Sequence, residues 1–269
     1  TVLTNGNVGI NSSSPSTRLA VGGTSYFSQT STFGGNISNL IDSNTVVSQI
    51  ATVNVGYGPR SVFVSGRYAY VANDTSNTIS VVDISNPAIP VQIATTSVGT
   101  TPYSIYVSGR YAYTANYGSA NISVIDISNP VFPRQIATAS AGTGPIAIYV
   151  SGRYAYVANN DSNNISIIDI SNPLAPIQIA TTNVGYSPRS VFVSGRYAYT
   201  ANFTSDTISV VDISNPATPV QIATTSVGDG PISVYVSGRY AYVANYTGGG
   251  TISVVDISNP LAPSQIATV

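Results

Sequence analysis

The stretch Val64-Ser-Gly-Arg-Tyr-Ala-Tyr70 decides the fold, because the sequence contains it five times. The other four copies begin at Val107, Val150, Val193 and Val236, and the glycines of successive copies lie 43 residues apart. Self-similarity at a fixed period of this size is typical of propellers and solenoids. Each repeat is therefore expected to be one structural unit, and any function has to be interpreted with this repetition in view.

Each repeat contains four short segments that are rich in β-branched and aromatic residues, as β-strands are. In the first repeat these segments are 61–64, 67–73, 78–84 and 91–96, and Gly, Asn, Ser or Pro separates each from the next. No segment has helical spacing. Four strands joined by short turns in a unit of about 43 residues make one blade of an up-and-down propeller. We therefore expect an all-β fold, a five-bladed β-propeller of four-stranded antiparallel blades.

The second strand of each repeat alternates large and small side chains. In the first repeat Tyr68 and Tyr70 point to one face, and Ala69 and Val71 point to the other. This alternation predicts that the rings of one blade pack on the small residues of the next. Because the tyrosines recur inside strands, we interpret them as core between blades rather than as a platform for sugars or bases.

Two segments carry a family resemblance. Tyr70-Val-Ala-Asn-Asp-Thr-Ser-Asn-Thr-Ile-Ser-Val-Val-Asp83 resembles the YVTN-type propeller repeat of prokaryotic cell-surface proteins, and Val81-Val-Asp-Ile-Ser-Asn-Pro87 resembles the LVIVD repeat. The resemblance covers residues 46–269. It implies a propeller on a prokaryotic cell surface and leaves the function open.

Residues 1–45 lie outside the repeat and read as an N-terminal extension. Gly6-Asn-Val-Gly-Ile10, Ser14-Pro15 and Arg18-Leu-Ala-Val21 resemble the short repeats of bacterial and phage fibre-type surface proteins. That resemblance implies an assembly segment. A linker is the alternative interpretation.

The number of strands predicts one surplus outer strand. Third-strand motifs occur five times, whereas the fourth-strand motif Gln-Ile-Ala-Thr occurs six times. The first copy is Gln49, Ile50, Ala51 and Thr52, and the last is Gln265, Ile266, Ala267 and Thr268. A closed ring of five blades needs five outer strands, so either 46–53 or 263–269 is left over. An unpaired strand of this kind can pair with another chain.

The composition excludes several classes of function. Charged residues make up 7% of the chain and the net charge is −1, which gives no basic surface for nucleic acid. Cysteine is absent, so there are no disulfides. No apolar run is long enough to span a membrane. No motif indicates a bound cofactor.

Catalysis is not expected. The chain has no His and no Cys, the usual general base and thiolate nucleophile. Arg and Asp recur once per blade, at 67 and 83 in the first, which favours structural ion pairing over a metal or acid–base site. The oxygen-rich turn 160–164 lacks calcium-loop spacing, and we interpret it as a solvated turn.

Variation between repeats is concentrated on one rim of the predicted propeller. This rim contains the loop that leads into each first strand and the turn between the second and third strands. Variable loops on a rigid scaffold are common binding sites. The candidate contact residues there are Tyr57, Arg60, Tyr103, Tyr186 and Arg189.

Eight Asn-x-Ser/Thr sequons are possible glycosylation sites, and a chain this rich in Asn, Ser and Thr also produces sequons by chance. A polar, lysine-free, cysteine-free surface favours an extracellular or cell-surface location. The eight asparagines are Asn11, Asn36, Asn73, Asn121, Asn160, Asn164, Asn202 and Asn245.

Three functional hypotheses follow from the sequence. The first is a non-enzymatic extracellular structural or adhesive protein, a self-assembling fibre or filament subunit linked head to tail by strand donation. Its partners would be further copies of itself, cell-surface glycans or proteins. The second is a monomeric glycan- or protein-binding module that uses the variable rim. The third is a glycoside-cleaving enzyme with paired carboxylates in the central funnel, which five near-identical repeats disfavour.

Overall fold

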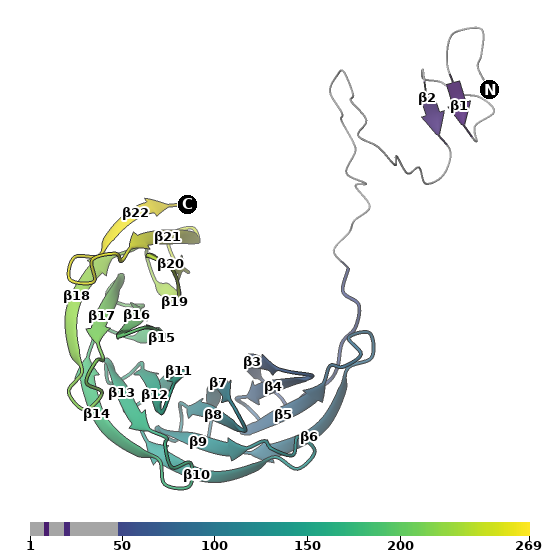
Figure 1. Cartoon of the computed structure of the whole chain (residues 1–269), viewed down its shortest axis with the longest axis horizontal. Helices are drawn as coiled ribbons and strands as arrows, with labels where there is room; N and C mark the ends of the chain where they lie inside the picture. The colour runs from purple at the N-terminus through teal and green to yellow at the C-terminus, as the bar shows by residue number, and fades with distance from the viewer. Residues whose placement is uncertain (1–7, 11–18, 22–47) are drawn as a thin grey trace. The chain divides into compact units, whose positions relative to one another are not determined.

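The computed structural model describes residues 8–10, 19–21 and 48–269, and it divides the chain into two units, Thr1–Ser48 and Gln49–Val269. In the first unit, β1 (Val8–Ile10) and β2 (Leu19–Val21) pair in parallel. The second unit holds all five repeats (Figure 1). Among the described residues, no helix is long and apolar enough to cross a membrane.

The second unit consists of five four-stranded antiparallel sheets, here called blades 1 to 5 in chain order. Blade 1 contains β3 (Pro59–Ser65), β4 (Tyr68–Asn73), β5 (Thr78–Asp83) and β6 (Val91–Ser97). Blade 2 contains β7 (Pro102–Ser108), β8 (Tyr111–Asn116), β9 (Asn121–Asp126) and β10 (Arg134–Ser140). Blade 3 contains β11 (Pro145–Ser151), β12 (Tyr154–Asn159), β13 (Asn164–Asp169) and β14 (Ile177–Asn183). Blade 4 contains β15 (Pro188–Ser194), β16 (Tyr197–Asn202), β17 (Thr207–Asp212) and β18 (Val220–Ser226). Blade 5 contains β19 (Pro231–Ser237), β20 (Tyr240–Asn245), β21 (Thr251–Asp256) and β22 (Ser264–Thr268).

The strands of each blade are hydrogen-bonded in chain order, with the first strand innermost and the fourth outermost (Figure 1). The predicted all-β fold of five four-stranded blades is confirmed. The repeated Ser-Gly-Arg is the hairpin between the first two strands. Gly66 has φ 58° there, in the left-handed region that glycine adopts without strain.

A buried asparagine at the end of the second strand ties three segments of each blade together. In blade 1, Asn73 Nδ2 donates to Ser80 Oγ at 3.0 Å, and the same oxygen accepts from Gly56 N at 3.3 Å. A Cβ on Gly56 would lie 2.7 Å from the Asn73 side chain, so only glycine fits the leading loop here. The other blades repeat this bond between the second and third strands with Asn116, Asn159, Asn202 and Asn245.

The repeated arginine and aspartate form the predicted structural ion pairs, and the structure places each pair within one blade. In blade 1, Arg67 Nη2 donates to Asp83 Oδ2 at 2.6 Å, while Asp83 Oδ1 accepts from Ser85 N at 2.9 Å. The ion pair joins the first hairpin to the end of the third strand. The equivalent pairs are Arg110–Asp126, Arg153–Asp169, Arg196–Asp212 and Arg239–Asp256.

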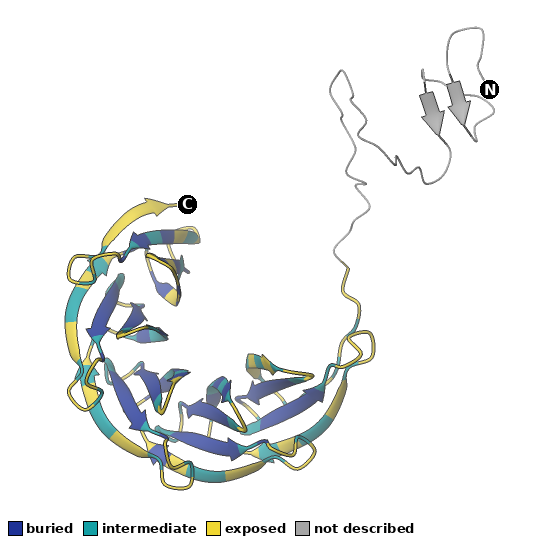
Figure 2. Ribbon diagram, viewed as in Figure 1, coloured by how far each residue is buried: buried dark blue, intermediate teal, exposed yellow. Residues whose placement is uncertain are grey.

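The hydrophobic core lies between blades (Figure 2). We call the side of a blade that meets the following blade its forward face, and the opposite side its rear face. Tyr70 and Ile79 on the forward face of blade 1 share a buried cluster with Ile105, Ala112 and Ile125 on the rear face of blade 2. Three further clusters join blades 2 to 5 in the same way. The prediction that the second tyrosine of the motif packs in the core between blades is confirmed. The next blade contributes one small residue, such as Ala112, and larger valines and isoleucines to each cluster.

The five blades follow an arc that is not closed between blade 5 and blade 1 (Figure 1). Within residues 48–269, no core cluster contains residues of both end blades. Because the arc is open, the first and last copies of Gln-Ile-Ala-Thr do not compete for one position in the fold. β22 pairs with β21 in its own blade, whereas Gln49, Ile50, Ala51 and Thr52 form no strand in the described part of the chain.

Valine and threonine alternate beside the buried asparagine, and this difference should alter stability. In blades 2 and 4, the hydroxyls of Thr114 and Thr200 donate to the asparagine Oδ1 at 2.8 Å. In blade 3 the equivalent residue is Val157, and the buried Asn159 Oδ1 has no partner. We expect Val157→Thr to raise the free energy of unfolding by about 1 kcal/mol and Thr200→Val to lower it by about 1–2 kcal/mol, measured by urea denaturation. A loss of stability in Val157→Thr would contradict this account.

The pH dependence of stability should come only from acid and alkaline titration. The hydrogen bonds from Arg67 and Ser85 lower the pKa of Asp83 to about 2. The contribution of the charged Asp83 to the free energy of unfolding is complete above the ordinary aspartate pKa of about 3.9, and it is lost as the pH falls towards 2. Burial raises the pKa of Tyr113 and Tyr156 to about 12, so their contribution is complete below about pH 10 and is lost between pH 10 and 12. Because the chain has no His, Cys, Lys or Glu, we expect Tm, followed by circular dichroism, to be flat from about pH 5 to 9. A Tm step near pH 6.5 would be inconsistent with these assignments.

Candidate functional site

The variable rim is built from the leading loop and the second turn of each blade. The two segments are joined by backbone hydrogen bonds, which in blade 1 run from Asp74 N to Gly58 O at 2.8 Å. All five blades contain this bond, so loop and turn are held against each other around the rim. The five predicted contact residues, Tyr57, Arg60, Tyr103, Tyr186 and Arg189, all lie in or next to the leading loops.

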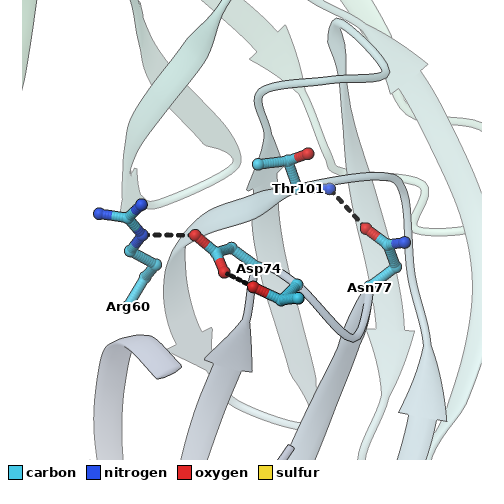
Figure 3. Close-up of polar contacts among 5 residues, drawn as sticks. Arg60, Asp74, Asn77 and Thr101 are labelled. Atoms are coloured by element: carbon cyan, nitrogen blue, oxygen red, sulfur yellow. Dashed lines mark hydrogen bonds and ion pairs between the residues drawn. The ribbon is translucent and has the colours of Figure 1, made fainter. Parts of the chain in front are cut away.

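Arg60 and Tyr103 are brought together across the boundary between blades 1 and 2. Arg60 Nε donates to Asp74 Oδ2 (Figure 3), and its guanidinium lies 4.6 Å from the centre of the Tyr103 ring. The hydrogen bond from Arg60, followed by that from Thr75, lowers the pKa of Asp74. The carboxylate therefore stays charged, and the arginine is held over the aromatic ring.

The contacts continue from blade 2 to blade 3. The Tyr103 and Tyr117 rings lie 5.2 Å apart, and Tyr117 Oη donates to Asp161 Oδ1 at 3.2 Å. That hydrogen bond raises the pKa of Tyr117. Arg60, Tyr103, Tyr117 and Asp161 thus form one line of contacts over three blades, which we call the rim network.

A second aromatic contact lies in blade 4, separate from the rim network. The Arg189 guanidinium stacks 3.5 Å from the centre of the Phe203 ring. Tyr186, in the same leading loop as Arg189, is 65% exposed, and Tyr57 in blade 1 is 82% exposed. The structure therefore places the five predicted residues on one rim without bringing them into one site. Arg60 and Tyr103 belong to the rim network, Arg189 stacks on Phe203, and Tyr57 and Tyr186 are exposed.

Side chains at the turn also link consecutive blades. Asn77 Oδ1 accepts from Thr101 N at 2.7 Å (Figure 3), and Asp206 Oδ1 accepts from Gly230 N at 2.8 Å. Asn77 and Asp206 have φ values of 56° and 53°, a conformation that Asn and Asp tolerate better than most residues. These bonds hold the turn of one blade against the leading loop of the next.

Three of the four aspartates on the variable rim are engaged within the protein, whereas Asp229, in the leading loop of blade 5, is exposed. Asp74 pairs with Arg60, Asp161 accepts from Tyr117, and Asp206 accepts from a backbone N–H. Among residues 48–269 and the two short strands, no group of three or more His, Cys, Asp or Glu side chains could hold a metal ion. In the turn predicted to be solvated, Asn163 Oδ1 and Asn164 Oδ1 also accept hydrogen bonds from the protein.

Two features of the site were missed from the sequence. The first is Tyr246, which is 69% exposed in the turn of blade 5, at the position of Tyr117 in blade 2 and Phe203 in blade 4. The signal was the recurrence of an aromatic residue directly after the buried asparagine. Comparing this one position between repeats would have identified it.

The second is a ladder of aromatic rings on the innermost strands. Phe63 and Tyr106 lie 4.8 Å apart between ring centres, and the contact continues at 4.9–5.0 Å through all five blades. The remaining rings are Tyr149, Phe192 and Tyr235. They recur every 43 residues, but the sequence alone does not show that they face one another.

Three of the predicted glycosylation sites are corrected by the structure. Asn73, Asn202 and Asn245 are at most 4% exposed, and their Nδ2 atoms donate hydrogen bonds inside the blade. The folded chain does not offer these nitrogens to a glycan. Asn121, Asn160 and Asn164 are half-buried, and Asn11 and Asn36 lie outside the described residues. These five stay predictions.

Solved structures with the same fold include several bacterial proteins. A functionally unknown protein from Desulfotomaculum acetoxidans DSM 771 is 14% identical, with a TM-score of 0.70 over 80% of this chain and 71% of that chain. A putative 6-phosphogluconolactonase from Bacteroides uniformis ATCC 8492 is 16% identical, with a TM-score of 0.71 over 81% and 73%. The periplasmic gluconolactonase PpgL of Pseudomonas aeruginosa is 18% identical, with a TM-score of 0.69 over 78% and 70%. At these identities the likeness concerns the fold alone.

The sequence comparison is more specific. No curated protein sequence matches the chain. The LVIVD repeat pattern matches five segments, one in each blade: 59–96, 102–136, 146–183, 185–225 and 232–269. Because these matches cover well over half of its length, the chain belongs to the LVIVD repeat family.

Proposed function

We propose that this chain is a non-enzymatic extracellular structural and adhesive protein, in which the blades form a rigid scaffold and the variable rim contacts a cell-surface glycan or protein. The observation that carries the proposal is the display of Tyr57, Tyr186 and Tyr246 on that rim, each 65–82% exposed. Exposed tyrosines on held loops provide large contact area at low entropic cost.

The difference between the two rims, one the same in every repeat and the other variable, supports this role. The opposite rim has Ser-Gly-Arg in every blade, and the arginine of each copy forms an ion pair with an aspartate of the same blade. The variable rim differs from blade to blade, as expected for a surface that recognises an irregular partner. The net charge of −1 and the absence of a basic surface disfavour nucleic acid as that partner.

The non-enzymatic part of the proposal rests on the carboxylates. General acid–base hydrolysis needs two groups with different pKa values near one substrate. Here the five repeated aspartates are equivalent, with pKa values of about 2. Of the four rim aspartates, 74, 161 and 206 are bonded to Arg60, Tyr117 and the Gly230 N–H, which leaves Asp229 as a single exposed carboxylate without a second one to act with it. The lactonase activity named for two similar structures belongs to those proteins.

A filament joined by strand donation is the second candidate function. The segment Gln49–Thr52 favours it, because Ile50 is 68% exposed and the segment belongs to no strand of the described chain. However, every blade of an intact copy already has four strands. Donation into a second copy would require β22 to leave β21, which makes this function the weaker candidate.

Substitution of the rim tyrosines tests the adhesive role. We expect the triple variant Tyr57→Ser, Tyr186→Ser and Tyr246→Ser to lose at least tenfold in affinity for immobilised cell-surface polysaccharides and intact prokaryotic cells, because the rings supply the contact area. Binding of labelled protein to both surfaces measures this. The matched control is Phe132→Ser, which removes a ring that is 76% exposed on the opposite rim.

Two results would count against the adhesive role. One is equal binding by the triple variant and the parent. The other is hydrolysis of 6-phosphogluconolactone by the purified chain above the spontaneous rate, which would return an enzymatic function to consideration.

Deletion of residues 1–53 tests the filament. If strand donation joins copies, negative-stain microscopy should show filaments of the full chain and single particles of the deleted chain, because the donor strand is gone. Assembly that is unchanged by the deletion would exclude donation by this segment.

A further inference from the structure

The rear face of blade 1 is the first of two open faces at the ends of the arc. Val62 and Val64 are 61% and 56% exposed there. The equivalent residues of blade 2, Ile105 and Val107, are 3% and 6% exposed because blade 1 covers them. With Val71 and Val82, Val62 lines an apolar groove of about 470 Å³, and residues 51–53 and 55 line it as well.

The forward face of blade 5 is the second open face, because no following blade covers it. Tyr242 and Ile252 are 40% and 47% exposed, whereas Tyr199 and Ile208, their equivalents in blade 4, are 3% and 0% exposed. The aromatic ladder also stops here, and its last ring, Tyr235, is 60% exposed. Each end of the arc therefore presents one half of an interface that occurs intact four times inside the unit.

The interfaces between neighbouring blades show what kind of surface each open face can bind. At three of the four internal interfaces, a hydrogen bond between innermost strands accompanies the apolar contacts, such as Ile105 N to Ser61 Oγ at 3.2 Å and Val234 N to Ser190 Oγ at 3.2 Å. Between blades 3 and 4, Ala147 takes the place of the serine. Blade 5 carries the next acceptor of this series, Ser233, on an exposed position, and blade 1 carries the equivalent amide at Val62. The faces therefore match another LVIVD blade in shape, apolarity and hydrogen bonding.

The length of similar solved chains argues against a second complete copy as the occupant. The five blades account for 70–73% of three similar solved chains, which is about five sevenths. The part of those chains that is not covered has the length of about two further repeats of 43 residues. A second copy that continued the arc from blade 5 would bring five, and its third blade would occupy the space of blade 1.

The unpaired segment Gln49–Thr52 indicates which strand the second of these two blades would lack. Gln49-Ile-Ala-Thr-Val-Asn-Val-Gly56 repeats the pattern of Gln92-Ile-Ala-Thr-Thr-Ser-Val-Gly99, which contains the outer strand of blade 1 and the loop into blade 2. Ala51 and Val55 lie in the groove on blade 1, as Ala94 and Val98 pack on the cluster with blade 2. The segment thus takes the place of a fourth strand whose blade lacks strands one to three.

We propose that the two open faces dock a segment of two further LVIVD repeats, one complete blade and the inner three strands of a second, which pairs with Gln49–Thr52 as its fourth strand. Seven strands would then close the ring. The forward face of blade 5 receives the complete blade, and the three-stranded sheet covers the rear face of blade 1.

The proposal can be tested by supplying that segment from the chain itself. Residues 97–169 contain β7 to β13, one complete blade and three strands, and they can be appended after Val269 in register. We expect the extended chain to be a monomer, to unfold in one transition, and to have a Tm higher by roughly 10 °C, because two apolar faces become buried. Thermal denaturation, light scattering and limited proteolysis measure these changes.

Two variants distinguish ring closure from a general effect of added repeats. Ile50→Pro removes strand pairing by Gln49–Thr52, so it should cancel most of the Tm gain in the extended chain and leave the parent unchanged. Val62→Asp together with Tyr242→Asp should be tolerated in the parent, where both sites are exposed, and should destabilise the extended chain.

Several outcomes would overturn the proposal. They are an appended segment that is cleaved as an unfolded tail, a Tm equal to that of the parent, and a Tm gain that Ile50→Pro leaves intact. If the extended chain aggregates, hydrogen exchange is measured on the parent chain instead. The proposal requires that the amides of residues 49–52 exchange rapidly there, because the strand that they pair with is absent. Slow, strand-like exchange of these amides in the parent would contradict it.

Discussion

The structure depends on the packing of one blade against the next. No blade has a core of its own, because both faces of each sheet are apolar and are covered mainly by the neighbouring blades. The forward tyrosine and isoleucine, such as Tyr70 and Ile79, are almost completely buried by the rear valines and isoleucines of the following blade. Each such side chain contributes roughly 1.5–3 kcal/mol on burial. Stability is therefore a property of the array, and the exposed residues at its two ends follow directly from this constraint.

Polar contacts give this packing its register. The buried asparagine, its serine partner and the tightly approached glycine hold the leading loop against the second and third strands of each blade. The rim side chains Asn77, Asn163 and Asp206 then carry the connection to the following blade. A buried polar group is costly unless bonded, so these bonds disfavour any sliding of one blade along another. The same network makes the loops of the variable rim a held surface on which exposed tyrosines can act.

Repetition and exception have different roles in this chain. The residues that occur five times, including the Arg–Asp pairs and the aromatic ladder, build the array and satisfy their own chemistry inside it. The residues that differ between repeats, such as Arg60, Tyr103 and Tyr246, gather on one rim. The third kind of exception is the outer strand without a blade at Gln49–Thr52. Adhesion by the rim and docking of further repeats at the ends are separate proposals, and each can fail without the other.

The sequence by itself determined the blade: its period of 43 residues, its four strands, its tight Ser-Gly hairpin, and the pairing of Arg with Asp. These are local properties, set by β-propensity, turn chemistry and short-range hydrogen bonds. It also located the variable rim and the surplus strand by counting. Only the tertiary structure decided which copy of Gln-Ile-Ala-Thr is unpaired, that three sequon asparagines are buried, and that Arg60 and Tyr103 meet while Arg189 stacks elsewhere. The reason is that closure of the ring and contacts between blades depend on the angle at which whole sheets pack, and no single repeat encodes that angle.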